Sequence, residues 1–273
     1  MFPILFSIGT VHVFSFSVFV LFAWSVFSFL FWRKLRSQGV FEQQIFDLMF
    51  YSTLVGLVFS RAVFVLTHAP LFVDNMLKIV ALWVQPGLSF YGGFLASTLT
   101  LLYLGRTYKV RVGMILDVVA VSLPWALVIG KIGSLLDGSE AGKLASIPWA
   151  VNIVGSVGAR HPVQIYELVA LVVLGMILLI FERRAQREKW PYGVVGVWFF
   201  LLFTPIFFAL EFFKESTLYY AQISANQWVL IALFAEALGA FYVRGGGREK
   251  LRPVIAGMKQ KIGNAVRKIS PRQ

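Results

Sequence analysis

The sequence contains no cysteine, so the chain forms no disulfide and supplies no thiol of its own as a nucleophile. Acidic residues are also scarce, because 13 Asp and Glu stand against 25 Lys and Arg, and histidine occurs three times. Histidines and carboxylates do not recur at a spacing typical of metal ligands, so we predict no metal site. The chain also lacks a nucleotide-binding signature, which argues against a nucleotide ligand.

Apolar residues are abundant: they make up 58% of the 273 residues and include 27 Phe and 8 Trp. This share is far above that of a soluble domain, and several apolar runs are long enough to cross a bilayer. The runs are continuous rather than alternating, which favours helices over a closed barrel. We therefore expect an all-α integral membrane protein.

Seven apolar segments are expected to span the membrane, at about residues 12–32, 45–66, 88–104, 114–132, 162–181, 194–213 and 226–243. Residues 68–85 are too polar to span, so we place them on the outer surface. Residues 134–160 are rich in Gly and Ser, and we expect them to form a small outer-face head between the fourth and fifth spans. The seven-helix membrane domain then covers residues 1–243.

Lysine and arginine gather in four clusters, at residues 33–36, 106–111, 183–189 and 244–272. Nucleic acid is the obvious partner for a net charge of +12, but topology explains the clusters better, because Lys and Arg collect on the cytoplasmic side. With the amino terminus outside and the carboxyl terminus in the cytoplasm, all four clusters lie on the same side. We therefore predict that orientation, and no nucleic-acid partner.

Two further predictions concern the first and the last residues of the sequence. Residues 1–11 have no basic n-region, so we expect no signal peptide there. Residues 244–273 form a basic cytoplasmic tail with apolar residues at helical spacing. This tail is either an amphipathic helix on anionic lipid or a solvated segment that sets the topology.

Ionisable side chains concentrate between residues 130 and 167, where they would be costly unless they faced water, one another or a polar ligand. Four glycines lie in this stretch: Gly130, Gly133, Gly138 and Gly142. A glycine-rich loop beside Lys131 can present amides and a cation to a phosphate. His161, Gln164 and Glu167 follow at three-residue steps, so they fall near one face of a helix.

For several other residues in or near the apolar runs, the sequence allows more than one interpretation. Arg61 lies within an apolar run, where it either pairs with a buried carboxylate or binds a phosphate. Asp117 is interpreted as structural, as a helix cap or an ion-pair partner. Gly92 and Gly93 allow close helix packing or expose amides to a ligand. Glu211 and Lys214 are three residues apart and are expected to share a helix face.

Three motifs together resemble one known family. They are Ser89-Phe-Tyr-Gly-Gly93, His161-Pro-Val-Gln-Ile-Tyr-Glu167, and Gly130–Gly142 followed by Ile147-Pro-Trp-Ala-Val151. Over most of its length, from Pro3 to about Gln227, the chain resembles the prolipoprotein diacylglyceryl transferases. These bacterial inner-membrane enzymes move a diacylglyceryl group from phosphatidylglycerol to the lipobox cysteine thiol of a prolipoprotein.

Several positions depart from the family pattern. Lysine replaces a family arginine at Lys131 and Lys214, and Phe207 replaces a third arginine. Ser134 and Asp137 stand where the family has asparagine, and Ser139 stands for its glutamate, with Glu140 one place later. The family's Tyr-Gly near the first span is Phe16-Ser17 here.

The resemblance implies a site and its partners. It implies Tyr91, Lys131 and His161 as catalytic residues, with Tyr91 and His161 both candidates for the general base. Phospholipid binding is implied for Lys131, Arg61, Lys214, Gly92, Gly93 and Gly133. Supporting roles are implied for Ser134, Asp137, Gly142, Gln164, Tyr166, Glu167 and Glu211. The implied partners are phosphatidylglycerol, a prolipoprotein signal peptide with a lipobox cysteine and the bilayer, with no cofactor, in the bacterial cytoplasmic (inner) membrane.

Two other functions compete with the transferase. Phe16, Ser17, Ser134 and Phe207 favour a relative that binds lipid or lipoprotein without turnover. A transporter has less support, because the sequence shows neither an inverted repeat nor a pair of broken helices.

Overall fold

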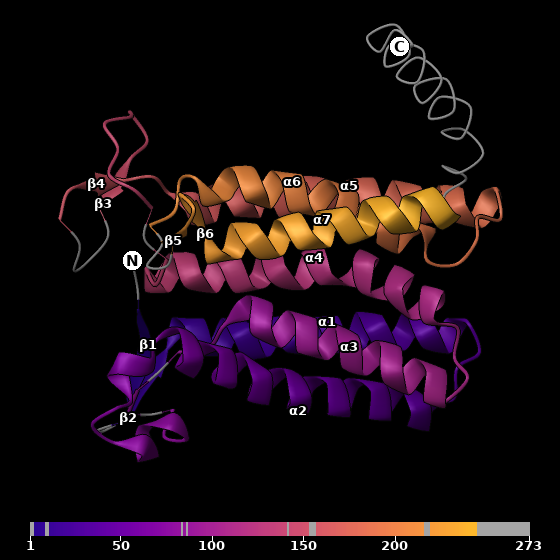
Figure 1. Ribbon diagram of the computed structural model, residues 1–273, viewed down its shortest axis with the longest axis horizontal. Helices are drawn as coiled ribbons and strands as arrows, with labels where there is room; N and C mark the ends of the chain where they lie inside the picture. Colours follow the sequence, from indigo (N-terminus) through magenta and orange to yellow (C-terminus); the bar gives the residue numbers. More distant parts are fainter. Residues whose placement is uncertain are drawn as a thin grey trace, which may run out of the picture.

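The computed structural model describes residues 3–8, 11–82, 84–85, 87–140, 142–152, 157–215 and 219–244. Within these residues the chain forms a bundle of seven α-helices (Figure 1). They are α1 (Ser15–Ser37), α2 (Glu42–Thr67), α3 (Phe90–Thr107), α4 (Val112–Asp137), α5 (Val163–Arg187), α6 (Val194–Glu211) and α7 (Ala225–Arg244). The expected helical bundle is confirmed, whereas the predicted basic tail lies, apart from the last residue of α7, outside the described residues.

Six of the described helices are long and apolar enough to cross a membrane, in agreement with a multi-pass membrane protein. The exception is α3, which is 18 residues long but contains several Gly, Ser and Thr residues among its apolar ones. Prolines lie inside two of the helices, Pro124 in α4 and Pro205 in α6. Membrane helices tolerate such prolines because neighbouring groups satisfy the freed carbonyls.

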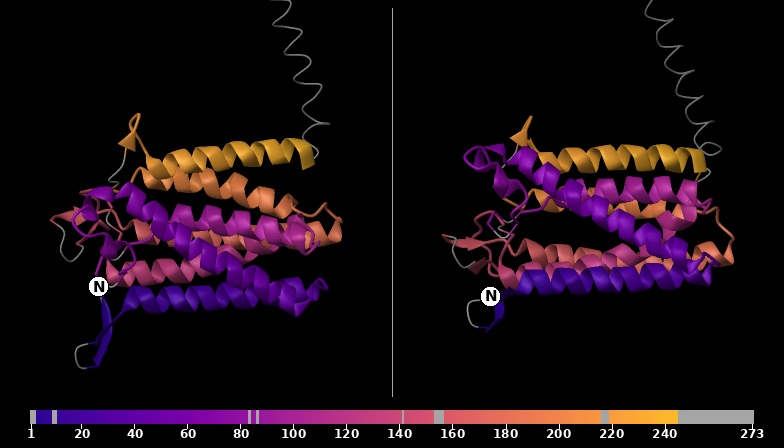
Figure 2. Two further views of the ribbon diagram at one scale, coloured as in Figure 1. Left: turned by 60° about the horizontal axis from the view of Figure 1, so that its bottom comes forward. Right: turned by 90° about the horizontal axis from the view of Figure 1, so that it is seen from below.

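Helix α4 lies at the centre of the bundle and packs against α1, α5 and α6 (Figure 2). It contributes to two apolar cores. One core joins α4 to α1 and α2 around Phe31, Ile45 and Ile115, and the other joins it to α5 and α6 around Leu174 and Phe199. Because both cores share α4, groups carried near its ends are positioned by the whole bundle.

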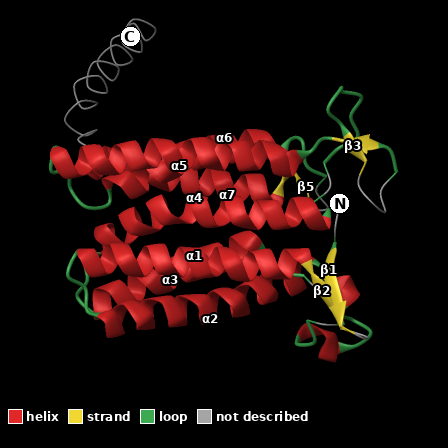
Figure 3. Cartoon of the chain, turned by 180° about the vertical axis from the view of Figure 1, so that it is seen from behind, coloured by secondary structure: helices red, strands yellow, loops and turns green. Residues whose placement is uncertain are grey.

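All the described strands lie at one end of the bundle (Figure 3). They form three antiparallel pairs: β1 (Ile4–Ile8) with β2 (Val11–Phe14), β3 (Val151–Asn152) with β4 (Ala159–Arg160), and β5 (Tyr219–Tyr220) with β6 (Ile223–Ser224). Two 3-10 helices lie in the predicted outer segment, η1 (Ala69–Leu71) and η2 (Met76–Ile79). We refer to this side of the molecule as the hairpin end.

Two boundary predictions were wrong. The first helix was expected from residue 12, but Ser7 pairs with His12 in the β1–β2 hairpin and α1 begins at Ser15. Residues 134–137 were expected in the head, but α4 continues to Asp137 and ends at Gly138, whose φ of 74° is the left-handed conformation typical of a helix C-terminus. The head therefore begins at residue 138.

The glycine-rich loop predicted beside Lys131 was wrong for its first two glycines, because Gly130 and Gly133 lie inside α4, whereas Gly138 and Gly142 follow the helix. Gly133 packs against α1: a Cβ at this position would lie 2.5 Å from Cβ of Phe19. The glycine is therefore needed for a close helix contact, and its amide is part of a helix rather than of an open loop.

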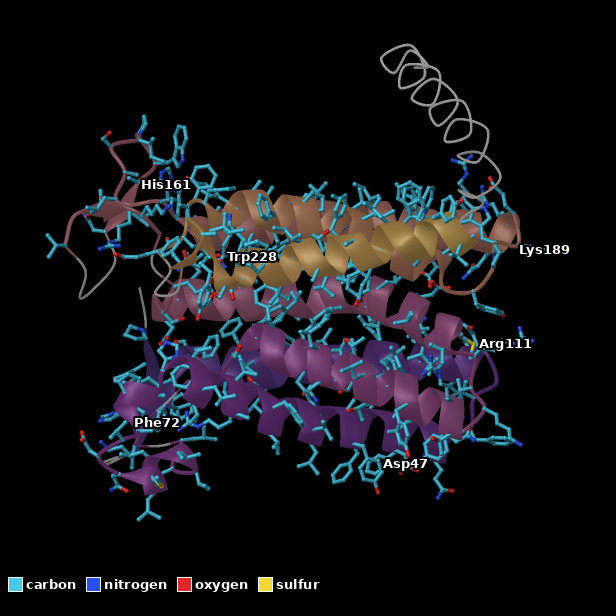
Figure 4. All side chains as sticks on the ribbon, in the orientation of Figure 1. Asp47, Phe72, Arg111, His161, Lys189 and Trp228 are labelled. Carbon is cyan, nitrogen blue, oxygen red and sulfur yellow. The ribbon has the colours of Figure 1, made fainter. Side chains whose placement is uncertain are left out.

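Basic residues mark the opposite end of the bundle. Figure 4 labels Arg111 and Lys189 there, and it labels His161 and Phe72 at the hairpin end. Asp117, near the start of α4, accepts hydrogen bonds from the backbone N–H groups of Gly193 (2.7 Å) and Gly196 (2.8 Å). It thereby caps the N-terminus of α6, which confirms the predicted structural role as a cap.

Candidate active site

An ion cluster of two lysines and three glutamates lies at the hairpin end, where α4, α5 and α6 approach one another. Lys131 of α4 contacts Glu140 at 2.6 Å and Glu167 of α5 at 2.5 Å, measured from Nζ to the carboxylate oxygens. Lys214 contacts the second oxygen of Glu167 at 2.6 Å, Glu140 at 3.5 Å and Glu211 at 3.8 Å. Glu211 and Lys214 do not share a helix face as expected, because α6 ends at Glu211, but they still lie 3.8 Å apart, with Glu167 the closer partner of Lys214.

The head holds Glu140 and Lys214 in place through a short run of backbone pairing. Gly142 forms a bridge with Lys214, and the N–H of Lys143 donates to the carbonyl oxygen of Phe213 at 2.8 Å. The N–H of His161 donates to the carbonyl oxygen of Lys143 at 3.0 Å. Gly142 must be glycine here, because a Cβ would lie 2.1 Å from the carbonyl oxygen of His161.

The cluster has a formal net charge of −1, because it contains three carboxylates and two ammonium groups. Burial works to raise the pKa of Glu140, but the attraction of Lys131 and Lys214 outweighs it and lowers that pKa to about 2. Burial works to lower the pKa of Lys214, but the surrounding glutamates outweigh it and raise that pKa above its usual value. Both groups therefore stay ionised at neutral pH.

The three carboxylates differ in how firmly they are held. Glu167 lies on α5 and its side chain is 1% exposed. Glu211, the last residue of α6, accepts hydrogen bonds from Asn226 (2.7 Å) and Ser224 (3.4 Å). Glu140 lies in the head and its side chain is 33% exposed. It is therefore the carboxylate of the three that reaches solvent.

Two of the supporting residues predicted from sequence hold the backbone of the cluster. Gln164 of α5 donates from Nε2 to the carbonyl oxygen of Glu140, and Ser134 is buried and donates to the carbonyl oxygen of Lys131 at 3.1 Å. Asp137 is the last residue of α4 and is half-buried. Gln164 and Glu167 thus turn to one side of α5, as their spacing predicts, whereas His161, expected on the same helix face, precedes the helix.

His161 belongs to an aromatic group beside the cluster. Its Nδ1 lies 3.3 Å from the hydroxyl of Tyr166, which accepts a hydrogen bond from Nε1 of Trp149 at 2.8 Å. The ring of His161 also contacts the ring of Phe213, with centroids 5.1 Å apart. Phe213 immediately precedes Lys214, so His161 packs against the segment that carries one lysine of the cluster.

Tyr91 approaches the cluster from α3. It packs beside the core that includes Phe207, and it lies within electrostatic range of Lys214, Glu211, Glu167 and Glu140. The following glycines face α2 instead: a Cβ on Gly92 would lie 2.7 Å from Val63, and one on Gly93 would lie 3.1 Å from Ser60. These two glycines thus allow α2 and α3 to pack closely, and their role in lipid binding stays a prediction.

Arg61 donates its hydrogen bonds to the backbone rather than to the buried carboxylate considered for it from the sequence. Its guanidinium donates to the backbone carbonyl oxygens of Lys78 (2.6 Å), Ile79 (2.7 Å) and Gly87 (2.9 Å). It also stacks near the rings of Phe64 and Phe72. Arg61 thus links Lys78, Ile79 and Gly87 to α2 through hydrogen bonds. Phosphate binding by this residue stays a prediction.

Sequence reasoning missed three residues that complete the cluster: Glu140, Ser224 and Asn226. Glu140 was seen in the motif but not included in the site, because it stands one place after the family's glutamate. Ser224 ends β6 and Asn226 lies in the first turn of α7, and two polar residues at the beginning of an apolar segment were the available signal.

Comparisons of the sequence with known proteins point to one family. A sequence model described as prolipoprotein diacylglyceryl transferase matches residues 3–243. A phosphatidylglycerol–prolipoprotein diacylglyceryl transferase of Nitrosomonas europaea is 30% identical over 250 residues, which covers 88% of each chain. The protein of that name from Geobacter sulfurreducens is 30% identical over 66% of this chain and 68% of its own, and the one from Wolbachia pipientis 27% identical over 78% and 82%. With 241 matched residues carrying the ion cluster and its supporting groups, the chain belongs to the prolipoprotein diacylglyceryl transferase family of membrane transferases.

Proposed function

We propose that the protein transfers the diacylglyceryl group of phosphatidylglycerol to the lipobox cysteine of a prolipoprotein signal peptide, in the bacterial cytoplasmic membrane. The observation that carries this proposal is the convergence of Lys131 and Lys214 on Glu167 at one end of the bundle. Both ammonium groups lie where an anionic headgroup at the membrane surface would meet them. Family membership supports the same reaction.

In the proposed orientation the hairpin end faces outward and all seven helices span the membrane. The basic residues at the opposite end support it, because Lys and Arg collect on the cytoplasmic side. The chain has no cysteine, so single cysteines can be introduced to test it. A membrane-impermeant maleimide should label Val157→Cys in intact cells, and should label Lys189→Cys only after permeabilisation. The reverse pattern would refute the orientation.

This reaction requires a site that activates the substrate thiol and binds the phosphate of the leaving group. A base removes the proton of the substrate thiol, and the thiolate sulfur attacks the glyceryl carbon that is esterified to phosphate. The carbon–sulfur bond forms as the carbon–oxygen bond breaks, and glycerol phosphate departs with the electron pair. Lys131 and Lys214 stabilise the negative charge on the phosphate, an effect that is large in a low-dielectric site.

Tyr91 and His161 are the two candidates for the base. Tyr91 packs beside the core that includes Phe207, next to the cluster, and the imidazole of His161 lies 3.3 Å from the hydroxyl of Tyr166. Replacement distinguishes them. If His161 is the base, His161→Gln lowers the transfer rate by about 100-fold or more, whereas Tyr91→Phe retains most of it. If Tyr91 is the base, Tyr91→Phe lowers the transfer rate by about 100-fold or more, whereas His161→Gln retains most of it.

The decisive experiment is transfer by the purified protein in phosphatidylglycerol liposomes to a synthetic lipobox peptide, followed by mass spectrometry of the thioether product. We expect the wild-type chain to modify the cysteine peptide but not the serine analogue. Lys131→Ala should lower the rate by roughly 100-fold, the loss typical of one electrostatic donor. Lys34→Ala is the matched control, because Lys34, in the last turn of α1, pairs with Glu182 near the C-terminal end of α5.

Complementation of a strain depleted of its own transferase tests the same proposal in cells. Rescue by the wild-type chain and not by Lys131→Ala, at equal membrane levels, supports it. Failure of the well-inserted wild-type chain in both experiments would refute it and favour the relative that binds lipid or lipoprotein without turnover.

A further inference from the structure

The ion cluster carries one more negative charge than positive, although the proposed donor is itself an anion. With Glu140, Glu167 and Glu211 all in place, Lys131 and Lys214 are already neutralised. Adding a phosphate with one negative charge would bring the cluster to a formal charge of −2 in a region of low dielectric, where like charges repel strongly. A phosphate can join without this penalty only if one carboxylate leaves.

Glu140 is the carboxylate that can leave. Glu167 is 1% exposed and contacts Lys131 at 2.5 Å and Lys214 at 2.6 Å, so its carboxylate is enclosed by the bundle and held by the closest contact of each lysine. Glu211 is held by Asn226 and Ser224. Glu140 is 33% exposed, and its side chain can rotate into solvent while Gln164 continues to hold its backbone carbonyl.

Glu140 also makes the contacts that a phosphate would make. Its two oxygens lie 2.6 and 2.8 Å from Nζ of Lys131, and one of them lies 3.5 Å from Nζ of Lys214. A phosphate that replaces it gives both ammonium groups an anionic partner again and leaves the formal charge of the cluster at −1. The exchange is therefore balanced in charge, and the buried part of the cluster is undisturbed.

We propose that Glu140 is an internal competitor of the donor phosphate: its carboxylate occupies Lys131 and Lys214, and an anionic phospholipid binds by displacing it. This inference rests on the proposed function in taking a phospholipid as the ligand, but it concerns binding and needs no thiol acceptor. A zwitterionic phospholipid bears the same phosphate with a compensating ammonium, which the outward-turned Glu140 carboxylate can pair with. Glu140 therefore sets how strongly the site discriminates between headgroups.

The test measures binding of fluorescent short-chain phosphatidylglycerol and phosphatidylcholine to the purified full chain by fluorescence anisotropy. We expect Glu140→Gln to bind phosphatidylglycerol about tenfold more tightly than the wild type, with a smaller change for phosphatidylcholine. Glu140→Asp keeps the charge but shortens its reach, so its affinity should lie between the two. If Glu140→Gln does not fold, tighter binding by Glu140→Asp carries the test.

Glu182→Gln is the matched control, because Glu182 also contacts a lysine through both oxygens, at 2.5 and 2.7 Å from Nζ of Lys34. It should leave the affinity for both lipids unchanged. Equal or weaker phosphatidylglycerol binding by the Glu140 variants overturns the inference, as does an equal gain in the Glu182 variant. Tighter binding without transfer to a lipobox peptide keeps the inference and refutes the proposed function, and transfer without tighter binding does the opposite.

Discussion

Replacing Lys131 by methionine removes the ammonium that joins Glu140 to Glu167, and its effect on stability follows from the geometry. Lys131 is 16% exposed and Glu167 is 1% exposed, so the pair is largely buried. Removing one partner of a buried ion pair costs about 3–5 kcal/mol of unfolding free energy. Glu167 keeps Lys214 at 2.6 Å, which places the expected loss at the lower end, about 3 kcal/mol.

A loss of this size is measurable as a shift of the thermal unfolding midpoint. For a domain of this length, 1 kcal/mol corresponds to roughly 2–4 °C, so we expect a decrease of about 6–12 °C. The eight tryptophans allow the midpoint to be followed by intrinsic fluorescence in mild detergent. The matched control is Lys34→Met, whose partner Glu182 is 20% exposed, and we expect it to lose only about 1 kcal/mol.

A double variant isolates the electrostatic part of the effect. Adding Glu140→Gln to Lys131→Met removes the carboxylate that has lost its closest partner, so the double variant should be more stable than the sum of the single losses predicts. We expect a coupling of about 1–2 kcal/mol, within the range seen for contacting charges. A midpoint for Lys131→Met within 1 °C of the wild type, or an equal decrease for Lys34→Met, would refute this reasoning.

Three further predictions concern the supports of the site. Arg61→Met should raise hydrogen exchange across residues 69–82 at least tenfold by mass spectrometry, because three hydrogen bonds to backbone carbonyls are lost, and unchanged exchange would contradict the fastening role. Asp117→Asn should reduce the unfolding free energy by about 1–2 kcal/mol, since one amide oxygen cannot cap both N–H groups of α6 or match the helix dipole. Gly142→Ala should cost about 2 kcal/mol and slow transfer, because its Cβ meets the backbone of His161, and a variant with wild-type stability would show that the head can shift.

Sequence alone predicted the helices well, because long apolar runs bounded by Lys and Arg have few alternatives. It did not predict the β1–β2 hairpin. Val, Ile and Phe favour strands as well as membrane helices, so hydropathy cannot locate the point at which a strand passes into an apolar helix. The end of α4 was missed for a similar reason, since Gly130 and Gly133 resemble loop residues until their neighbours are known.

The candidate site was predicted in part. The three-residue spacing correctly placed Gln164 and Glu167 together on α5. The spacing could not predict Glu140 as their partner, because the chain turns at the left-handed Gly138 and helical periodicity ends there. The partners of Arg61 could not be predicted either. They are backbone carbonyl oxygens, which every residue has, so the sequence does not indicate which of them Arg61 contacts.

Lys131 illustrates why activity and stability have to be measured together in this family. Any variant that loses its ammonium loses both the proposed phosphate ligand and the Lys131–Glu167 ion pair between α4 and α5, so a slow Lys131→Ala enzyme does not by itself reveal a chemical role. Lys131→Arg separates the two effects, because a guanidinium keeps the charge and can bind Glu140 and Glu167 through different N–H groups. We expect its thermal midpoint to stay within about 4 °C of the wild type, equivalent to about 1 kcal/mol.

The transfer rate of Lys131→Arg, measured well below every midpoint, then reports on chemistry alone. If Lys131 acts by holding the phosphate, the bidentate fork of arginine should retain the rate within about tenfold or raise it. A stable Lys131→Arg enzyme that is as slow as Lys131→Ala would contradict a purely electrostatic role. It would show that the site requires the single, compact charge of lysine, whose ammonium fits between Glu140 and Glu167 without displacing either.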